Sequence, residues 1–338
     1  MTDPSHACLV KQIKRALAHQ QSFPERRPIL NSMLSKLEHR LHLQRSCRKI
    51  GLGGVGVKII KYIRPLATLA PLDQALSTEI RSFVGELNKE ALASMADFLG
   101  QATAVVTIIS CDKNLQKSRP LAARFSAWGE EDKLKTIVIT GNKRLPDWRF
   151  RFNADNHHLE VSCPDNYESL PLKILTLLWV LSLQDKAPAV LKVDDDARPG
   201  ESWRLSKLLG KLNRNLEPSA AGFPVFTPST LSLDRGWHLG KSEGSWKSKP
   251  FDSIGTKSWM SGGAGYALNS SAVNQLSSFY INSWGFASSM VYEDVCISML
   301  MQAMGAKFHW LENPYDLGIS TERHTEIDAG LWQNEYSY

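Results

Sequence analysis

The sequence predicts an α/β fold with a mostly parallel central sheet, preceded by a helical region over residues 1–100. From residue 103 onward, short runs of β-branched residues alternate with apolar helical stretches, which indicates a parallel sheet covered by helices on both faces. Residues 1–100, in contrast, carry only helical periodicity. The composition, with 43% hydrophobic and 22% charged residues in a chain of 338, is that of a globular protein that can bury a core without disulfides.

The helical region contains two amphipathic stretches. The first has an apolar stripe at helical spacing, formed by Leu30, Met33, Leu34, Leu37 and Leu41. A second helix is expected after Pro71, with Asp73 as its cap. Its apolar face continues along the chain through Leu76, Ile80, Phe83, Leu87, Leu92, Met95 and Leu99. Gly100 follows directly and is expected to cap the carboxyl end of the last helix.

A glycine-rich segment lies between these stretches, and three interpretations of it stay open. Gly51, Gly53 and Gly56 match the spacing of a dinucleotide-binding loop, but the motif needs a preceding strand and a long following helix. Neither is expected, because RSCRK precedes the segment and Pro65 curtails any helix after it. A simple loop is the second interpretation. The third is an interfacial segment on anionic lipid, because isoleucines and basic residues are interleaved over residues 58–64.

The remainder of the chain alternates strands and helices. Strands are expected at residues 104–109, 136–140, 189–193 and 221–226, and helices at residues 117–128, 170–184 and 200–213. Binding sites in sheets of this kind form at the carboxyl ends of the strands. The domain predicted over residues 101–338 is therefore expected to carry its site where these strands end.

Three consecutive carboxylates follow the apolar strand at residues 189–193. Asp194, Asp195 and Asp196 concentrate negative charge at the end of this strand, and a cation would relieve their repulsion. Carboxylate oxygens suit Mg²⁺ or Mn²⁺, which commonly bridge one or two carboxylates to the phosphates of a substrate. An ordinary loop, with one aspartate capping the next helix, is the alternative.

Two later segments strengthen the interpretation as a site. Gly262, Gly263 and Gly265 lie in WMSGGAGYAL, where the backbone can approach a ligand closely or take positive φ. Glu293 and Asp294 begin an apolar helix, where one of them can act as a general base. A plain turn and a favourable interaction with the helix dipole are the respective alternatives.

Charge and cysteine content limit the partners and the compartment. Forty Lys and Arg against 34 Asp and Glu give a net charge of +6, which suits nucleic acid, an anionic membrane or a phosphorylated substrate. The five scattered cysteines contain no CxxC pair, which favours a reducing compartment over a disulfide framework. We find neither a secretory signal nor an apolar run long enough to span a membrane, so a cytoplasmic protein is expected.

Five ordered segments resemble the β-1,3-glycosyltransferase family that includes β-1,3-galactosyltransferases, Fringe and core 1 galactosyltransferase (glycosyltransferase family 31). They are VVTIISCDKNLQKSRPLAARFSAWG, DNYESLPLKILTLLWVL, LKVDDDARP, WMSGGAGYALNSSAV and YEDVCISMLMQAMGAKF. The resemblance spans about residues 103–330 and implies a GT-A fold, a nucleotide-sugar-binding α/β sandwich. It also implies an inverting, metal-dependent hexosyltransferase that moves galactose or an N-acetylhexosamine from a UDP-sugar to a glycan hydroxyl, in a β-1,3 linkage.

The resemblance assigns roles to single residues. Asp294 would be the catalytic base, and Glu293 would contact the sugar or orient the loop. Asp196 would coordinate Mn²⁺, or Mg²⁺ in its place, while Asp194 and Asp195 would hold the ribose, the donor sugar or a metal-bound water. The donor pocket would further include Gly262, Gly263, Gly265, Trp259, Arg119 and Arg124, with Trp259 either stacking on the sugar or lying in the core.

A histidine often completes the metal shell in this family. His324 is the first candidate and His309 the second. The chain departs from the family pattern at Ser298, where glycine is common, and at Arg124, which is displaced by one position. Eukaryotic members have a membrane anchor and paired cysteines, and this sequence shows neither. These departures suggest a bacterial-type enzyme at the inner face of a membrane, or a Golgi-lumen enzyme without its anchor.

Two alternatives from other classes remain. The first is a nucleotide-sugar-binding protein without catalysis, and the second is a basic module that binds a membrane or nucleic acid. The second offers no reason for three aspartates at a strand end, which would repel phosphates, so no nucleic-acid partner is expected. The expected partners are a UDP-sugar, a glycan or lipid-linked glycan acceptor, and a membrane surface that contacts the basic N-terminal region.

Overall fold

The computed structural model describes residues 81–321, except Phe83, Asp147, Asn215 and the ranges 227–240, 244–246, 248–257, 283–286 and 288–289. Several predictions from the sequence lie outside these residues. They are the helix over residues 29–48, the start of the helix after Pro71, the glycine-rich segment at 51–56 and the metal ligand His324.

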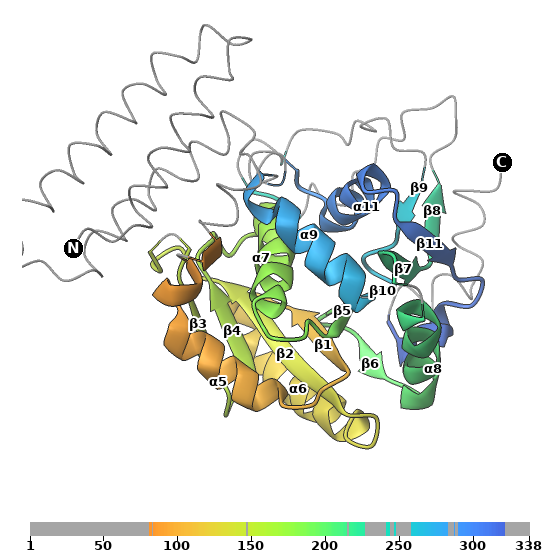
Figure 1. Cartoon of the computed structure of the whole chain (residues 1–338), viewed down its shortest axis with the longest axis horizontal. Coiled ribbons are helices and arrows are strands. Elements are labelled where there is room, and N and C mark those ends of the chain that lie inside the picture. The colour runs from red at the N-terminus through yellow and green to blue at the C-terminus, as the bar shows by residue number, and fades with distance from the viewer. Residues whose placement is uncertain are drawn as a thin grey trace, which may run out of the picture.

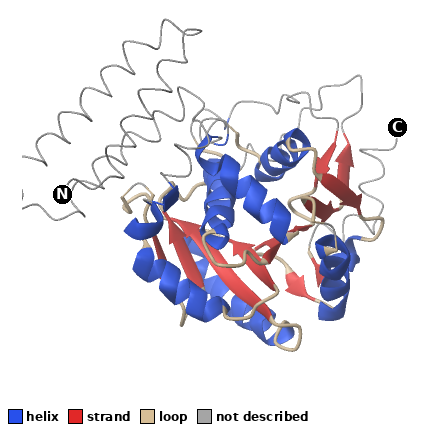
Figure 2. Cartoon of the chain, viewed as in Figure 1, coloured by secondary structure: helices blue, strands red, loops and turns tan. Residues whose placement is uncertain are grey.

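An eight-stranded sheet forms the centre of the described part (Figures 1 and 2). Its strands are β1 (Ala104–Ile109), β2 (Leu134–Gly141), β3 (Phe150–Asn153), β4 (His158–Val161), β5 (Ala189–Asp194), β7 (Ser219–Gly222), β10 (Tyr266–Leu268) and β11 (Lys307–Trp310). Their order across the sheet is β11-β7-β10-β5-β1-β2-β4-β3. β10 and β3 run antiparallel to their neighbours, and the other strands are parallel. The predicted α/β fold with a mostly parallel sheet is confirmed.

Helices cover both faces of this sheet. They are α5 (Lys89–Leu99), α6 (Leu115–Trp128), α7 (Leu170–Ser182), α8 (Ser202–Asn213), α9 (Ser270–Asn282) and α11 (Glu293–Ala303). Alternate residues of the central strands face opposite ways, so Val105 and Val190 pack with α7, α9 and α11, while Val106 and Leu191 pack with α6 and α8. Three short 3-10 helices lie between these elements: η2 (Asp112–Asn114), η3 (Tyr167–Ser169) and η6 (Pro314–Leu317). Two small two-stranded sheets complete the described fold. One pairs β12 (Ile319–Ser320) with β6 (Arg198–Pro199), and the other pairs β8 (Pro224–Phe226) with β9 (Ser258–Met260).

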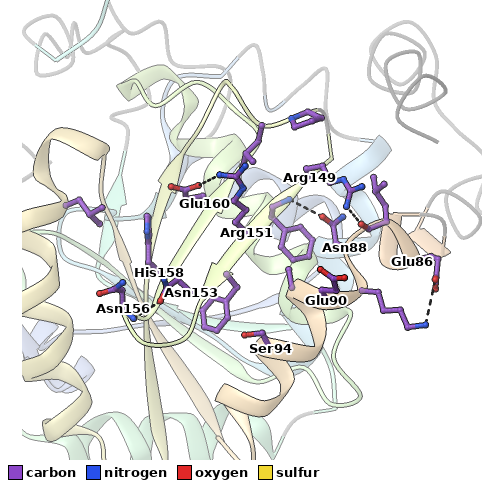
Figure 3. A pocket seen from close by; sticks show the side chains of 18 of the residues that line it. Glu86, Asn88, Glu90, Ser94, Arg149, Arg151, Asn153, Asn156, His158 and Glu160 are labelled. Atoms are coloured by element: carbon purple, nitrogen blue, oxygen red, sulfur yellow. Dashed lines mark hydrogen bonds and ion pairs between the residues drawn. The ribbon is translucent and has the colours of Figure 1, made fainter. Parts of the chain in front are cut away.

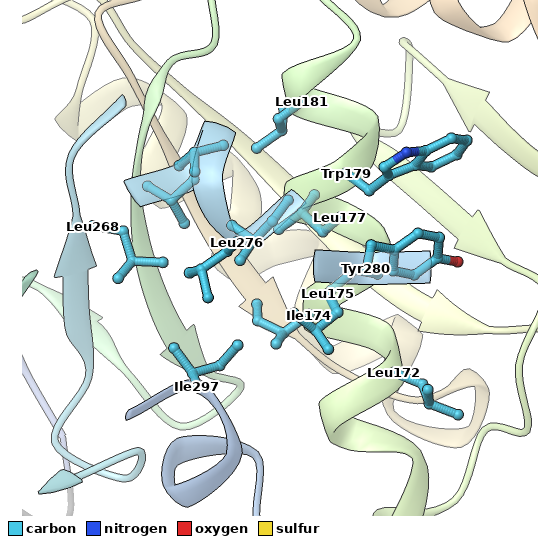
Figure 4. Close-up of a cluster of buried hydrophobic side chains, with 14 of the residues drawn as sticks. Leu172, Ile174, Leu175, Leu177, Trp179, Leu181, Leu268, Leu276, Tyr280 and Ile297 are labelled. Carbon is cyan, nitrogen blue, oxygen red and sulfur yellow. The ribbon is translucent and has the colours of Figure 1, made fainter. Parts of the chain in front are cut away.

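The larger core cluster lies where α7, α9 and α11 meet the sheet (Figure 4). Twelve of the thirteen residues of α7 are buried, which explains why its sequence is apolar on all sides. Trp179 stacks on Tyr280 of α9, with ring centroids 5.2 Å apart, and Thr176 donates a hydrogen bond to the Tyr280 hydroxyl. This packing fixes α7 against α9.

One strand prediction was wrong. Residues 221–226 were expected to form a single strand, but the chain leaves the main sheet after Gly222 and resumes as β8 against β9. Pro224 has no backbone N–H to continue the ladder, and Phe223 turns its carbonyl toward the N–H of Ser261. The strands expected at 104–109, 136–140 and 189–193 are confirmed, as are the three helices expected after residue 103, within two residues at each boundary.

The last part of the predicted helical region packs on the sheet domain. α5 ends at Gly100, whose φ of +51° makes it the expected C-cap. Met95 and Leu99 are buried in the same core cluster as Phe150 of β3. The division of the chain at residue 100 stays a prediction. In the described part of the chain, none of the helices combines the length and apolar character that crossing a bilayer requires.

Candidate active site

Two of the predicted carboxylates, Asp194 and Glu293, pair with Lys192 at the carboxyl end of β5. Lys192 is 1% exposed, and its Nζ atom lies 2.8 Å from Asp194 Oδ1 and 3.0 Å from Glu293 Oε2. The same ammonium donates to the carbonyl of Gly262 at 3.1 Å. A buried charge must be paired, and here the pairing joins three segments that are far apart in the sequence.

The glycine loop between β9 and β10 approaches Asp294 directly. The N–H of Gly262 donates to Asp294 Oδ2 at 2.9 Å, and a Cβ atom at Gly262 would lie only 3.0 Å from the Cβ of Asp294. The other oxygen, Oδ1, accepts from the N–H of Val295 at 2.8 Å. Gly265 has a φ of +82°, as expected for a glycine position, and packs against the carbonyl of Lys192. Gly263 lies partly exposed in the same loop.

Glu293 and Asp294 differ in their surroundings although they are neighbours. Glu293 is 5% exposed, and both of its oxygens are bound by side chains: Oε2 by Lys192, and Oε1 by the hydroxyl of Tyr266. Asp294 is partly exposed, and its two oxygens accept hydrogen bonds from the backbone N–H groups of Gly262 and Val295. Of the two carboxylates, Asp294 is therefore the more accessible to solvent.

Burial contributes to the pKa shifts of Glu293, Asp294 and Lys192. Burial raises the pKa of Glu293 to about 7, against the opposing effect of Lys192. The pKa of Asp294 is also raised by burial, although its hydrogen bond from Gly262 opposes the shift. Burial lowers the pKa of Lys192, but Asp194 and Glu293 outweigh it, so the net shift is upward and the ammonium stays charged.

Asp195 is held from a different side, by the loop between β1 and α6. Asn114 donates to Asp195 Oδ2 at 2.9 Å, Ser110 donates to the same oxygen at 3.4 Å, and Lys117 lies 3.9 Å from Oδ1. The turn η2 ends at Asn114, the residue before α6, so the first turn of α6 lies beside Asp195.

A second buried lysine supports this loop. Lys173 of α7 is 1% exposed and pairs with Asp165 Oδ1 at 2.5 Å, and it also donates to the carbonyl of Ser110 at 3.0 Å. Asp165 in turn accepts from the backbone N–H of Gly141 at 2.7 Å and of Asp112 at 2.5 Å. These contacts tie the ends of β1 and β2 to α7 and thereby fix the loop that holds Asp195.

Three predicted residues do not join the carboxylates. Trp259 is 1% exposed and belongs to the core cluster, so its ring presents no face to a sugar and the core interpretation holds. Arg124 is exposed on α6, roughly 14 Å along the helix axis from Leu115. His309 lies on β11, which is separated from β5 by β7 and β10, or roughly 14 Å at ordinary strand spacing.

The oxygen ligands at the end of β5 fit a hard divalent cation. Asp194, Asp195 and Asp196 are all partly exposed at this edge of the sheet. Within the described ranges, no group of three or more His, Cys, Asp or Glu side chains is arranged to hold a metal by itself. Mg²⁺ and Mn²⁺ sites commonly use one or two carboxylates, with water and substrate phosphates as the other ligands, so the residues present fit such an ion.

Arg119 lines a pocket of about 1140 Å³ between α5, α6 and the outer strands (Figure 3). Its lining is polar and of mixed charge, including Glu90, Arg119, Arg151, Asn153, His158 and Glu160. Arg151 and Glu160 pair across neighbouring strands at 4.0 Å. None of the five acidic residues of the cluster lines this pocket. Leu115, next to the Asp195 partner Asn114, also lines it, so the two regions adjoin.

Sequence reasoning missed Lys192, Tyr266 and the Lys173–Asp165 pair as parts of the site. A signal for Lys192 was present, because a lysine inside the apolar run AVLKV, in a strand expected to be covered on both faces, must find a buried partner. Lys173 gives the same signal in the apolar run LPLKILTLLWVL. Nothing local in the sequence identifies the partners.

A comparison with protein families identifies the family of the chain. A family model described as Galactosyltransferase matches residues 127–312, more than half of the 338 residues. The match covers β2 to β11 and includes all five acidic residues at the site, and the fold is consistent with the GT-A architecture. No curated protein matches the chain. The domain is that of a glycosyltransferase, a class that uses a sugar donor and a glycan acceptor. The chain belongs to the galactosyltransferase family, as the resemblance of its motifs predicted.

Proposed function

We propose that the protein is an inverting, metal-dependent transferase that moves galactose or an N-acetylhexosamine from a UDP-sugar to a glycan hydroxyl, in a β-1,3 linkage. The observation that carries the proposal is the convergence of Asp194 and Asp294, which Lys192 and Gly262 join through hydrogen bonds at the carboxyl end of β5. Carboxylates for a cation and for a base are thereby brought to one site.

Asp294 is the proposed general base. Its carboxylate accepts the proton of the acceptor hydroxyl while that oxygen forms a bond to the anomeric carbon of the donor. The bond from the anomeric carbon to the diphosphate breaks in the same step, and its electron pair leaves with UDP. The partial exposure of Asp294 and the upward shift of its pKa support this role, because a base works best when its pKa approaches the working pH.

Asp196 is the proposed metal ligand, with Asp194 and Asp195 beside it toward the ribose, the donor sugar or a metal-bound water. When bound, Mn²⁺ or Mg²⁺ would offset the negative charge that develops on the departing diphosphate. The contacts of Asp194 with Lys192 and of Asp195 with Asn114 hold both carboxylates in place before a donor arrives. Preorganisation of this kind lowers the cost of arranging charges during the reaction.

The first experiment is a donor panel. The purified protein is incubated with UDP-galactose, UDP-N-acetylglucosamine and UDP-N-acetylgalactosamine, with and without Mn²⁺, and the release of UDP is followed. Metal-dependent turnover of one donor is expected and would name the sugar. Failure of every donor, together with no thermal shift from UDP and Mn²⁺, would contradict the proposal. Binding of UDP without turnover of any donor would favour a binding protein that lacks catalysis.

A further inference from the structure

We infer that Lys192 and Tyr266 are positioning residues that hold the first turn of α11 in place and so present Asp294 to the acceptor. The inference rests on the proposed function for its kinetic consequence, but its structural content can be tested without substrate. We argue the inference from the strand register, from the hydrogen bonds that Glu293 accepts, and from the three hydrogen bonds that the Lys192 ammonium donates.

The strand register places both side chains on one face of the sheet. Tyr266 of β10 pairs directly with Lys192 of the antiparallel neighbour β5, so the two side chains project from the same face. The ammonium lies 5.8 Å from the centre of the Tyr266 ring. Val190, which has the same parity as Lys192, belongs to the core cluster that contains α11 residues, so this is the face that α11 covers.

Glu293 receives one hydrogen bond from each of the pair. The Tyr266 hydroxyl donates to Oε1 and the Lys192 ammonium donates to Oε2, so both oxygens of the carboxylate are bound inside the protein. Glu293 begins α11, and Asp294 is the next residue. A carboxylate fixed at both oxygens therefore determines where the neighbouring carboxylate points. In this arrangement Glu293 holds the first turn of α11 in place and does not act as a second base.

The Lys192 ammonium has three N–H donors, and three oxygens of other residues lie within hydrogen-bond distance to accept from them. The acceptors are Asp194 Oδ1 at 2.8 Å, Glu293 Oε2 at 3.0 Å and the carbonyl of Gly262 at 3.1 Å. With its donors engaged and its side chain 1% exposed, Lys192 acts through its neighbours and not by contact with a substrate phosphate. It links the strand end that carries Asp194, the loop that holds Asp294, and the helix on which Asp294 lies.

The test compares two tyrosine-to-phenylalanine variants. Tyr266→Phe removes the hydroxyl that binds Glu293, and Tyr280→Phe removes a hydroxyl that accepts from Thr176 in the core. Both tyrosines are buried, with exposures of 0% and 1%, so the two changes are closely matched in volume and burial. Hydrogen exchange is measured in the full-length protein at pH 8 (about one unit above the Glu293 pKa), for peptides covering residues 259–266 and 291–300.

Faster exchange in both peptides of Tyr266→Phe, but not of Tyr280→Phe, is the expected result. Equal exchange in the two variants would overturn the inference, whatever the substrate. Kinetics give the second readout: kcat of Tyr266→Phe should fall by about 10- to 100-fold with the affinity for UDP unchanged, because misplacement of a reacting group affects the chemical step. A fall in UDP affinity with unchanged kcat would also overturn it.

Failure of the proposed function looks different from failure of this inference. A wild-type protein that turns over no UDP-sugar contradicts the proposed function, and hydrogen exchange still decides whether Tyr266 and Lys192 hold α11. Lys192→Met serves as a third variant, with loss of protection expected at both residues 259–266 and residues 291–300. If that variant does not fold, Tyr266→Phe alone carries the test.

Discussion

The backbone N–H of Gly262 donates a hydrogen bond to Asp294 Oδ2 at 2.9 Å, which joins the glycine loop to the first turn of α11. The contact depends on the missing side chain, because a Cβ atom at residue 262 would lie 3.0 Å from the Cβ of Asp294 and 3.1 Å from its Oδ2. The absence of a side chain at residue 262 therefore lets the backbone approach and orient the carboxylate that we propose as the base.

Replacement of Asp294 tests the assignment of the base. Asp294→Asn keeps the size of the side chain and an acceptor for the N–H of Gly262, but it cannot take a proton. We expect kcat to fall by about 10²- to 10⁴-fold while the affinity for UDP is kept, as measured by UDP release and by calorimetry. Glu130→Gln, a change at an exposed residue just after α6, is the control and should leave kcat unchanged. Normal turnover by Asp294→Asn would exclude it as the base.

Asp196 is tested by the metal dependence of nucleotide binding. If Asp196 holds the cation, Asp196→Ala should lower the affinity for UDP in the presence of Mn²⁺ and have little effect in its absence. Loss of a protein ligand weakens the bridge between carboxylate, ion and phosphate. Calorimetric titration of UDP with and without Mn²⁺ measures both values. Retention of the full wild-type response to Mn²⁺ in the variant would refute the assignment.

The raised pKa of Glu293 predicts that the free energy of unfolding declines as the pH rises. Its pKa is raised from 4.5 to about 7, so the folded protein binds this proton more tightly than the unfolded chain does. The contribution of Glu293 to stability is therefore most favourable below about pH 4.5 and declines as the pH rises through about 7, by at most about 1.4 kcal/mol per pH unit. Above the folded pKa the contribution is constant.

Denaturant unfolding between about pH 5 and pH 8 measures this effect. Glu293→Gln removes the titrating group, so the free energy of unfolding of the variant should decline less steeply than that of the wild type up to about pH 7. The exposed-site variant Glu130→Gln should follow the wild type. Parallel curves for wild type and Glu293→Gln would show that the carboxyl does not titrate with the raised pKa.

The ion pairs Lys173–Asp165 and Lys89–Glu86 differ in burial, so substitution of the two lysines should differ in its cost to stability. Lys173→Met leaves Asp165 without its buried partner and should lower the free energy of unfolding by about 3–5 kcal/mol. Lys89→Met removes an ion pair with Glu86 whose side chains are both 75% exposed, and should cost at most about 1 kcal/mol. Denaturant titration of both variants checks this. Equal midpoints for them would mean that the Lys173–Asp165 pair does not hold the strand ends together.

Alanine substitutions at two glycines with positive φ distinguish the cost of backbone strain from the cost of steric crowding. Gly305→Ala, at a φ of +68° with no atom within 4 Å of the added Cβ, should cost about 1–2 kcal/mol from strain alone. Gly265→Ala combines a φ of +82° with a Cβ contact of 3.0 Å to the carbonyl of Lys192, so it should cost more. It should also lower activity, because that contact lies beside the site. Denaturant unfolding of both variants measures this, and a midpoint for Gly265→Ala at or above that of Gly305→Ala would contradict the prediction.

Much of the fold could be predicted because its signals are local. The β-branched runs at residues 104–109 and 189–193 and the all-round apolar helix at residues 170–184 each specify an element from neighbouring residues alone. The single strand expected at residues 221–226 failed because Phe223 and Pro224 divide it between two sheets, and strand pairing is decided by partners distant in the sequence.

The candidate site divides in the same way. The sequence by itself determined the chemical types at the site, since three aspartates after an apolar strand and a carboxylate pair at a helix start are visible without any coordinates. Only the tertiary structure decided that Glu293 is bound at both oxygens while Asp294 stays partly exposed. It also removed Trp259 from the sugar pocket, because the ring lies in the core.

The physical reason is that a buried charge needs partners, and the chain order does not name them. Lys192 stands in an apolar strand, which reveals that it must be paired, but its acceptors come from residues 194, 262 and 293. Those segments meet only because β10 pairs with β5 and α11 covers that face of the sheet. Sequence therefore determined the types of acidic group at the candidate site, and tertiary packing decided how they are aligned.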